Sequence, residues 1–291
     1  MNPKKLIITH HTPDLDAVGA AWMLKRFDSQ NYADAQFAFV NPGERISEQQ
    51  AQQLGSNLHN VTHVDTGLGK FDHHQPDRSK KNTCASILVY KHVCKLHPSL
   101  KEDKALKELV FYINEIDHFQ EIHWPDANNL RYMFMIQELI RGHELAYPQN
   151  DEAQMYFGLK CLECAYHSLK LAIIANQLIE QEGIQFSLNQ GACVGILTAN
   201  DDTIKQALKQ GYLLAIRKDP NQDYIRIKLR PDSSFSLKKL YQEIIKIDPE
   251  ASWFYHPGGK MLLNGSSKHR NQTASKLSLN KIIELTKKVY A

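Results

Sequence analysis

The sequence predicts an α/β fold with two domains joined by a long helix, and three observations support this. Over residues 1–150, short apolar runs alternate with helical patterns, which is typical of a parallel sheet. Residues 151–182 then form one helical pattern without proline. After residue 183, short strand patterns dominate. We therefore expect a parallel-sheet domain at 1–150, a connecting helix at 151–183 and a smaller α/β domain at 184–291.

In the first part of the chain, the expected strands are apolar runs rich in Ile, Val and Phe. They cover residues 5–9, 35–40 and 61–64. The first expected helix starts near Asp16, because a carboxylate can cap a first helical turn. Further helices are expected at 47–58, 83–96, 102–116 and 130–141.

In the last part of the chain, Gly183 is expected to end the long helix. Strands are expected at 184–188, 192–197, 212–217 and 224–229, and helices at 203–209, 236–245 and 278–289. In the last of these strands, the polar residues Tyr224, Arg226 and Lys228 alternate with apolar ones. This alternation predicts that one face of the strand is exposed.

The composition is that of an ordinary globular protein. Of the 291 residues, 42% are hydrophobic and 23% are charged, so a packed core is expected. A net charge of +3 is too small to imply nucleic-acid binding by itself. The basic residues are unevenly placed, however, because Glu284 is the only acid after His256.

The cysteines and the N-terminus point to a cytoplasmic protein. The five cysteines are scattered and odd in number, so they predict no disulfide framework. Cys161 and Cys164 have the spacing of a metal-binding pair, but no second pair accompanies them, and we interpret them as neighbours on one helix face. The apolar run Leu6-Ile7-Ile8 is too short for a signal peptide. No stretch approaches the length of a membrane span, so no membrane partner is expected.

Histidines and aspartates gather after the expected strands. His10, Asp14 and Asp16 follow the first strand, Asp65 ends the third, and Asp72-His73-His74 comes shortly afterwards. The carboxyl ends of parallel strands are where α/β sheets place their ligands. Mixed oxygen and nitrogen donors suit cations such as Mn²⁺. The alternative for the isolated aspartates is a helix cap or a turn.

Two further features complete the expected site. Asp117, at the end of the helix expected at 102–116, is another candidate ligand. Two adjacent histidines, His73 and His74, point in different directions, so one can bind metal while the other contacts substrate. Asp72 can orient a histidine through a hydrogen bond. Together these residues predict a two-metal site.

These motifs, in this order over residues 6 to about 120, resemble the DHH phosphoesterase superfamily. That group includes single-strand exonucleases, oligoribonucleases, cyclic-dinucleotide phosphodiesterases and family II inorganic pyrophosphatases. The resemblance implies a role for each motif residue. By that likeness, His10 and Asp14 would hold one metal, and Asp16, His73 and Asp117 would hold the other. Asp65 would bridge the two metals, and His74 would face the phosphate.

The chain departs from the usual pattern in one respect. In most of the superfamily a strand–helix unit separates the second and third motifs, whereas here Asp65 and Asp72 are close in sequence. This layout resembles the Myg-type branch of metal-dependent nucleases and uncharacterised relatives, which also carry Phe-Asp-His-His-Gln. A turn-forming role for Asp65 therefore stays open beside the bridging one.

The C-terminal part resembles the DHH-associated substrate domain loosely. That domain often carries a glycine-rich motif ending in histidine, and here Pro257-Gly258-Gly259-Lys260 has lysine at that place. Glycine N–H groups and basic side chains suit an anion. The predicted substrate-binding residues are therefore Gly258, Gly259, Lys260, Lys268 and Arg270. The alternative is a solvated basic loop.

We predict a metal-dependent phosphoesterase that hydrolyses a phosphodiester, with water activated by two divalent ions. Mn²⁺ is the first choice, and Mg²⁺ or Co²⁺ are alternatives. The expected partner is a phosphate-containing small molecule or a short single-stranded nucleic acid, and a homodimer is compatible with the sequence. Three alternatives stay open: an inorganic pyrophosphatase, a non-catalytic nucleotide- or phosphate-binding regulator on the same fold, and a metal-dependent hydrolase of another bond.

Overall fold

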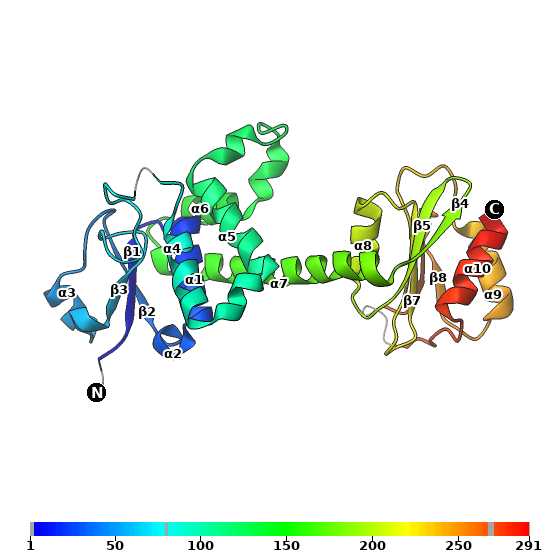
Figure 1. Ribbon diagram of the computed structural model, residues 1–291, viewed down its shortest axis with the longest axis horizontal. Helices are drawn as coiled ribbons and strands as arrows, with labels where there is room; N and C mark the ends of the chain where they lie inside the picture. Colours follow the sequence, from blue (N-terminus) through cyan, green and yellow to red (C-terminus); the bar gives the residue numbers. More distant parts are fainter. Residues whose placement is uncertain (1–2, 79–80, 267–270, 291) are drawn as a thin grey trace. The chain divides into compact units, whose positions relative to one another are not determined.

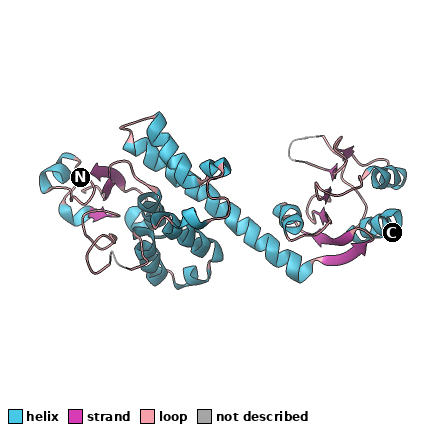
Figure 2. Ribbon diagram, turned by 90° about the horizontal axis from the view of Figure 1, so that it is seen from above, coloured by secondary structure: helices cyan, strands magenta, loops and turns pink. Residues whose placement is uncertain are grey.

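The computed structural model describes residues 3–78, 81–266 and 271–290, and Figure 1 shows its elements. The chain divides into two compact units, residues 1–169 and 170–291, which we call the N-terminal and the C-terminal unit. The division falls inside helix α7, Asp151–Glu182, which is unbroken in Figure 2. The expected α/β class and the long helix are confirmed. No helix in the described ranges is long and apolar enough to cross a membrane.

The N-terminal unit is built on a parallel sheet of three strands in the order β2-β1-β3. The strands are β1 (Leu6–His10), β2 (Gln36–Val40) and β3 (Val61–His63). The central strand β1 is buried because its neighbours pair with it on both edges. Since the strands run parallel, their carboxyl ends meet at one edge of the sheet, where His10 lies.

Six helices and four short 3-10 turns accompany this sheet among the described residues. The helices are α1 (Leu15–Phe27), α2 (Ser29–Tyr32), α3 (Glu48–Gln53), α4 (Ala85–Leu96), α5 (Lys104–Asp117) and α6 (Ile136–Ala146), and the turns are η1 (Leu58–Asn60), η2 (Pro98–Glu102), η3 (Gln120–His123) and η4 (Leu130–Phe134). Gly19 lets α1 pack closely, because a Cβ atom there would lie 2.6 Å from both Ile113 and Ser86. This close approach brings the start of α4 beside the start of α1.

Two expectations for this unit need correction. Helix α1 starts at Leu15, and its N-cap is Asp14 rather than Asp16, because Oδ1 of Asp14 accepts the N–H groups of Asp16 and Ala17, each at 3.0 Å. The helix expected at 130–141 is instead the turn η4 followed by α6.

The C-terminal unit is a mixed sheet of six strands in the order β4-β5-β6-β7-β9-β8. Its elements are β4 (Ile184–Leu188), β5 (Gly191–Leu197), α8 (Asp202–Lys209), β6 (Leu214–Lys218), β7 (Ile225–Leu229), α9 (Lys238–Ile247), β8 (Trp253–Tyr255), β9 (Met261–Asn264) and α10 (Leu279–Tyr290). Strands β5 and β6 are parallel, and the other neighbours are antiparallel. The hairpin of β8 and β9 was not predicted.

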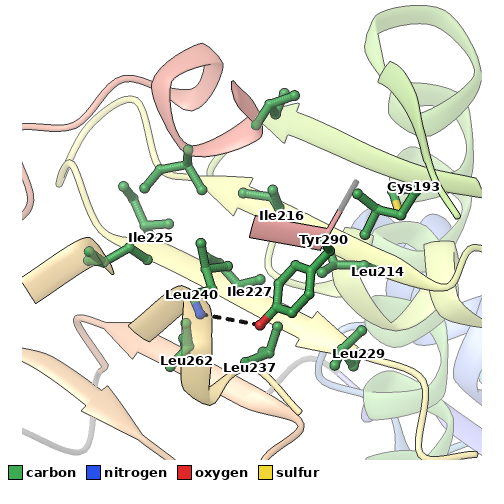
Figure 3. Packing of buried hydrophobic residues seen from close by; sticks show 14 of the residues in the cluster. Cys193, Leu214, Ile216, Ile225, Ile227, Leu229, Leu237, Leu240, Leu262 and Tyr290 are labelled. Atoms are coloured by element: carbon green, nitrogen blue, oxygen red, sulfur yellow. Dashed lines mark hydrogen bonds between the residues drawn. The ribbon is translucent and has the colours of Figure 1, made fainter. Parts of the chain in front are cut away.

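One side of this sheet forms a hydrophobic core with α9 and α10 (Figure 3). Tyr290 of α10 is largely buried there, and its hydroxyl oxygen accepts the backbone N–H of Leu240 at 3.2 Å. Strand β7 alternates as predicted, since Ile225, Ile227 and Leu229 are buried whereas Arg226 is half-buried and Lys228 is exposed. The apolar face of this strand therefore belongs to the core.

Candidate metal centre

The carboxylate of Asp65 lies between two histidines at the carboxyl edge of the N-terminal sheet. Nε2 of His10 is 3.3 Å from Oδ2 of Asp65, and Nε2 of His73 is 3.3 Å from Oδ1. Asp65 has φ +52°, in the left-handed region that residues other than glycine seldom adopt. Its N–H donates to the carbonyl of Phe71 at 2.9 Å, so the intervening loop returns beside it. This return is what brings His73 to Asp65.

The first group of donor atoms contains His10, Asp14 and Asp65. Nδ1 of His10 lies 2.8 Å from the carbonyl oxygen of His11. Because a carbonyl only accepts, Nδ1 carries a proton, and loss of the second ring proton would leave a lone pair on Nε2 for a metal. Nε2 is 4.0 Å from Oδ2 of Asp14, while Oδ1 of Asp14 caps α1. The helix-cap and metal-ligand interpretations of Asp14 are therefore compatible, because each uses a different oxygen.

The second group contains Asp16, His73 and Asp117. Nε2 of His73 is 4.0 Å from Oδ2 of Asp16 and 3.8 Å from Oδ1 of Asp117. Asp16 is held in place by the start of α4, where its two oxygens accept the N–H groups of Ala85 at 2.6 Å and Ser86 at 2.8 Å. Asp117 is the last residue of α5. Three separate elements thus bring these side chains together.

His74 differs from His73 in exposure and in partner. Its side chain is 58% exposed, against 12% for His73. Nδ1 of His74 lies 2.8 Å from Oδ1 of Asp72, whose fully buried carboxylate also accepts the N–H of Leu68 at 2.6 Å. The Nδ1–H of His74 therefore donates to Asp72, and Nε2 is left open. Nδ1 is 3.8 Å from Oδ1 of Asp65, so His74 also lies beside the metal centre.

The donor atoms fit a cation better than they fit one another. Oδ1 of Asp65 and Nε2 of His73 are buried, and neither makes a well-aligned hydrogen bond among the described residues, although the two atoms lie 3.3 Å apart. Leaving buried polar atoms unsatisfied is costly, and native structures contain few of them. A cation held by these atoms would satisfy both. Because Asp65 belongs to one group with His10 and to another with His73 and His74, the arrangement fits two cations that share Asp65.

The pKa values of these side chains in the absence of metal also favour a bound cation. Burial by itself lowers the pKa of His10 and His73, but nearby carboxylates, Asp65 above all, raise each pKa to about 9. Burial, together with the charges of neighbouring carboxylates, raises the pKa of Asp16 and of Asp117 to about 7. These carboxylates need a compensating positive charge, which protons supply when no metal does.

The structure gives the glycine-rich loop of the C-terminal unit a structural role. The ammonium group of Lys260 donates to the carbonyl oxygens of Ser233 at 2.6 Å and Phe235 at 2.7 Å, and to the Ser233 hydroxyl at 2.9 Å. The N–H groups of Gly258 and Gly259 donate to Nδ1 and to the carbonyl oxygen of His256. These donors are therefore occupied, and an anion would have to displace their present partners. The anion-binding role stays a prediction, and Lys268 and Arg270 lie outside the described residues.

The structure also shows where the other residues singled out in the sequence lie. Guanidinium groups of Arg226 and of Arg217, which face each other across β6 and β7, pair with the carboxylate of Asp201. Cys161 and Cys164 lie on α7 with free thiols, and neither belongs to the metal-binding groups found in the described ranges. Sequence reasoning missed Ala85 and Ser86, which hold Asp16 through backbone atoms. No side-chain pattern signals such a contact.

No family model matches the chain, and no curated protein sequence matches it. Solved structures do match. One is described as the DHH domain of a member of a family of ribosomal proteins, with 13% identity, 99% of this chain and 88% of that chain covered, and a TM-score of 0.35. Another is an exopolyphosphatase-related protein from Bacteroides fragilis, with 12% identity and a TM-score of 0.30; the match covers 99% of this chain and 92% of that chain. A third is RecJ from Thermus thermophilus in complex with Mn²⁺, with 13% identity, 91% and 50% covered, and a TM-score of 0.29.

A DHH domain is thus among the structural neighbours of this chain. That is the superfamily that the sequence motifs resemble. TM-scores between 0.29 and 0.35 carry no functional argument, so the function proposed for this protein rests on the side chains of the metal centre.

Proposed function

We propose that this protein is a metal-dependent phosphoesterase that hydrolyses a phosphodiester in a nucleotide or a short oligonucleotide, using two divalent ions, with Mn²⁺ as the first choice. One observation carries the proposal. The two oxygens of Asp65 face two different histidines; His10 has one further carboxylate beside it, Asp14, and His73 has two, Asp16 and Asp117. Ions in two-metal hydrolases sit about 3.5–4 Å apart, and a carboxylate shared by both suits that separation.

Some residues of the centre would hold the metal ions, and others would contact the substrate. His10 and Asp14 would hold one ion, Asp16, His73 and Asp117 the other, and Asp65 would contact both. When bound, the ions supply an activated water and stabilise negative charge on the phosphoryl oxygens. The helix starts of α1 and α4 fix Asp14 and Asp16 through backbone N–H groups, so these ligands need no rearrangement on binding.

His74 is the residue best placed to contact the substrate. Its Nε2 atom is open, its side chain is exposed, and its ring is oriented by Asp72. In the protonated form, Nε2–H would donate to a phosphoryl oxygen beside the metal centre, which is a charge-assisted hydrogen bond. Asp72, being fully buried, acts through His74 and does not itself reach the substrate.

A substrate and metal panel tests the proposal. Purified protein is assayed on dinucleotides, short single-stranded RNA and DNA, and pyrophosphate, each with Mn²⁺, Mg²⁺ or Co²⁺ and with a chelator. We expect metal-dependent hydrolysis of a phosphodiester, abolished in the Asp65→Asn variant, which also serves as the control for contaminating phosphatases. If pyrophosphate were the only good substrate, the protein would be a pyrophosphatase, and the proposal would be wrong. Metal binding without turnover on any substrate would support a phosphate-binding regulator instead.

A further inference from the structure

A cavity of about 340 Å³ adjoins the metal centre within the N-terminal unit. Asp14, Asp16 and Asp117, three of the proposed metal ligands, form part of its wall. The rest of the wall comes mainly from α6 and from the turn that follows α5. A group attached to a phosphate at the metal centre would therefore be within reach of this cavity. The volume lies in the range of small-molecule sites, which is about 300–1,000 Å³.

The charge of the cavity disfavours a second anionic group. Beyond the proposed metal ligands, its described lining includes Glu121, Glu138 and Glu144 but only one cation, Arg141. Arg141 lies 3.8 Å from Glu138, which offsets part of its charge. A polyphosphate chain placed here would meet more like charge than opposite charge. The occupant must instead bring hydrogen-bond donors, because carboxylates only accept.

One of these glutamates has an unused acceptor. Oε2 of Glu121 is buried and has no hydrogen-bond partner among the described residues. Such an atom is costly to leave unsatisfied, and a ligand donor that reaches it after a turn of the side chain would satisfy it. The cavity therefore has an excess of negative charge, and one of the glutamates that line it has an oxygen atom that lacks a donor.

An aromatic ring completes the lining. Phe119 lines the cavity, its side chain is 71% exposed, and its backbone lies in the left-handed region with φ +56°. Leu15, Ile116 and Ile140 supply further apolar surface. An exposed ring beside apolar side chains suits a flat aromatic ligand, since bases stack on such rings regardless of their sequence.

We infer that this cavity binds a nucleobase that carries an amino group, with Phe119 stacked on its face and Glu121 and Glu138 accepting from its edge. The inference rests on the proposed function, because it places the base next to the reacting phosphate. The amino groups of cytosine, adenine and guanine donate to a carboxylate, whereas uracil presents a carbonyl oxygen where cytosine has its amino group. The cavity would thus set a base preference against uracil.

The test measures binding of nucleosides, which contain no phosphorus. Isothermal titration of the Mn²⁺-loaded protein compares two matched pairs, cytidine with uridine and guanosine with inosine, and each pair differs by one amino group. Because a hydrogen bond to a charged group is involved, we expect the amino-bearing member of each pair to bind about tenfold to a hundredfold more tightly. Equal affinities within either pair would overturn the inference.

Variants assign the preference to particular side chains. Glu121→Gln and Glu138→Gln together should bring each pair to within about threefold, because an amide accepts without carrying charge. Glu152→Gln, on an exposed position of α7 outside the cavity, is the matched control and should change nothing. Phe119→Ala should weaken all four nucleosides by about tenfold, as expected for the loss of base stacking. Phe134→Ala is its control, since Phe134 is 79% exposed and does not line the cavity.

The results separate this inference from the proposed function. Selective nucleoside binding without hydrolysis of any phosphoester would keep the inference and refute the proposed function. Phosphodiester hydrolysis without selective nucleoside binding would do the reverse. A preference that persists in the Glu121→Gln and Glu138→Gln variant, or an equal effect of Phe119→Ala and Phe134→Ala, would also overturn the inference. Melting curves of the variants check that each one folds.

Discussion

Oδ1 of Asp65 and Nε2 of His73 lie 3.3 Å apart, and both atoms are buried without a well-aligned hydrogen bond in the described part of the chain. Asp65 reaches this position only because its backbone adopts the left-handed conformation, which costs free energy for a residue with a Cβ atom. The fold therefore sustains two unfavourable features at one point. A cation bound by the two atoms would account for both, so metal binding should depend strongly on Asp65.

The first prediction concerns Asp65→Asn. Asparagine tolerates a left-handed backbone, so the variant should fold. The lost charge should weaken Mn²⁺ binding by more than a hundredfold, beyond the tenfold to hundredfold loss typical of residues that only orient a ligand. Elemental analysis and titration calorimetry measure this. The matched control is Asp77→Asn, at a side chain that is 74% exposed. If both variants retain two ions, Asp65 is no bridging ligand.

The second prediction separates the adjacent histidines. His73→Ala should lose metal, because Nε2 of His73 lies among three carboxylates. His74→Ala should retain both ions and lower kcat/KM by about tenfold to a hundredfold, the size expected for one charge-assisted hydrogen bond to the substrate. Metal content and steady-state kinetics of the two variants decide this. Equal metal loss in both variants would contradict the division of roles.

The third prediction concerns Asp72, which we propose acts through His74. Asp72→Asn should retain both ions, because Asp72 belongs to none of the metal-binding groups found in the described ranges. Turnover should fall, since the ring of His74 loses its fixed orientation. The melting temperature should also fall, because the buried carboxylate accepts N–H groups of Leu68 and His74. A variant with wild-type turnover and a lower melting temperature would restrict Asp72 to a structural role.

The fourth prediction concerns pH in metal-free protein. Protons bind His10 and His73 more tightly in the folded state, where each pKa is about 9, than in the unfolded state, where it is about 6.5. Their contribution to stability is therefore complete below about pH 6.5 and is lost as the pH rises through about 9. The raised pKa of Asp16 and of Asp117, about 7, acts in the same direction between about pH 4 and 7.

Calorimetric melting of chelator-treated protein should thus show a melting temperature that falls from pH 6 to pH 9. Saturating Mn²⁺ should remove most of this fall, because the ions replace the protons as compensating charge. The His10→Gln, His73→Gln double variant is the control, and its metal-free melting temperature should depend less on pH. A metal-free melting temperature that is constant or rises over this range would show that the histidines are not protonated among the carboxylates.

The arrangement of His10, Asp65 and the Asp72-His73-His74 run could be anticipated from sequence because the signals are local. Each stands at or just beyond a short apolar strand, and parallel strands bring their carboxyl ends together. The choice of helix cap could not be anticipated. Asp14 and Asp16 are both good caps, and Asp16 is drawn away by N–H groups of α4 that are about seventy residues distant in sequence.

Other parts of the sequence show too little hydrophobic periodicity for their structure to be predicted. Strands β8 and β9 have three and four residues and flank a loop with two glycines, so neither shows a clear alternation. The cavity beside the metal centre is built from glutamates and Phe119 that look like ordinary exposed residues in sequence. Only the packing of the turn after α5 and of α6 against the candidate metal centre shows that they share a wall.

The last prediction tests the structural role of Lys260. Its ammonium group donates to Ser233 and Phe235, so it joins the loop before α9 to the hairpin of β8 and β9. Lys260→Met keeps most of the side-chain volume but leaves two backbone carbonyl oxygens without their donor. The free energy of unfolding should fall by about 1–3 kcal/mol. kcat/KM should stay within about twofold, because the donors that would hold an anion are already occupied.

Lys276→Met is the control, since that side chain is 84% exposed. The opposite result, an unchanged melting temperature with a tenfold or larger loss of kcat/KM, would show that Lys260 leaves its present partners to bind the substrate phosphate, as its position after two glycines first suggested.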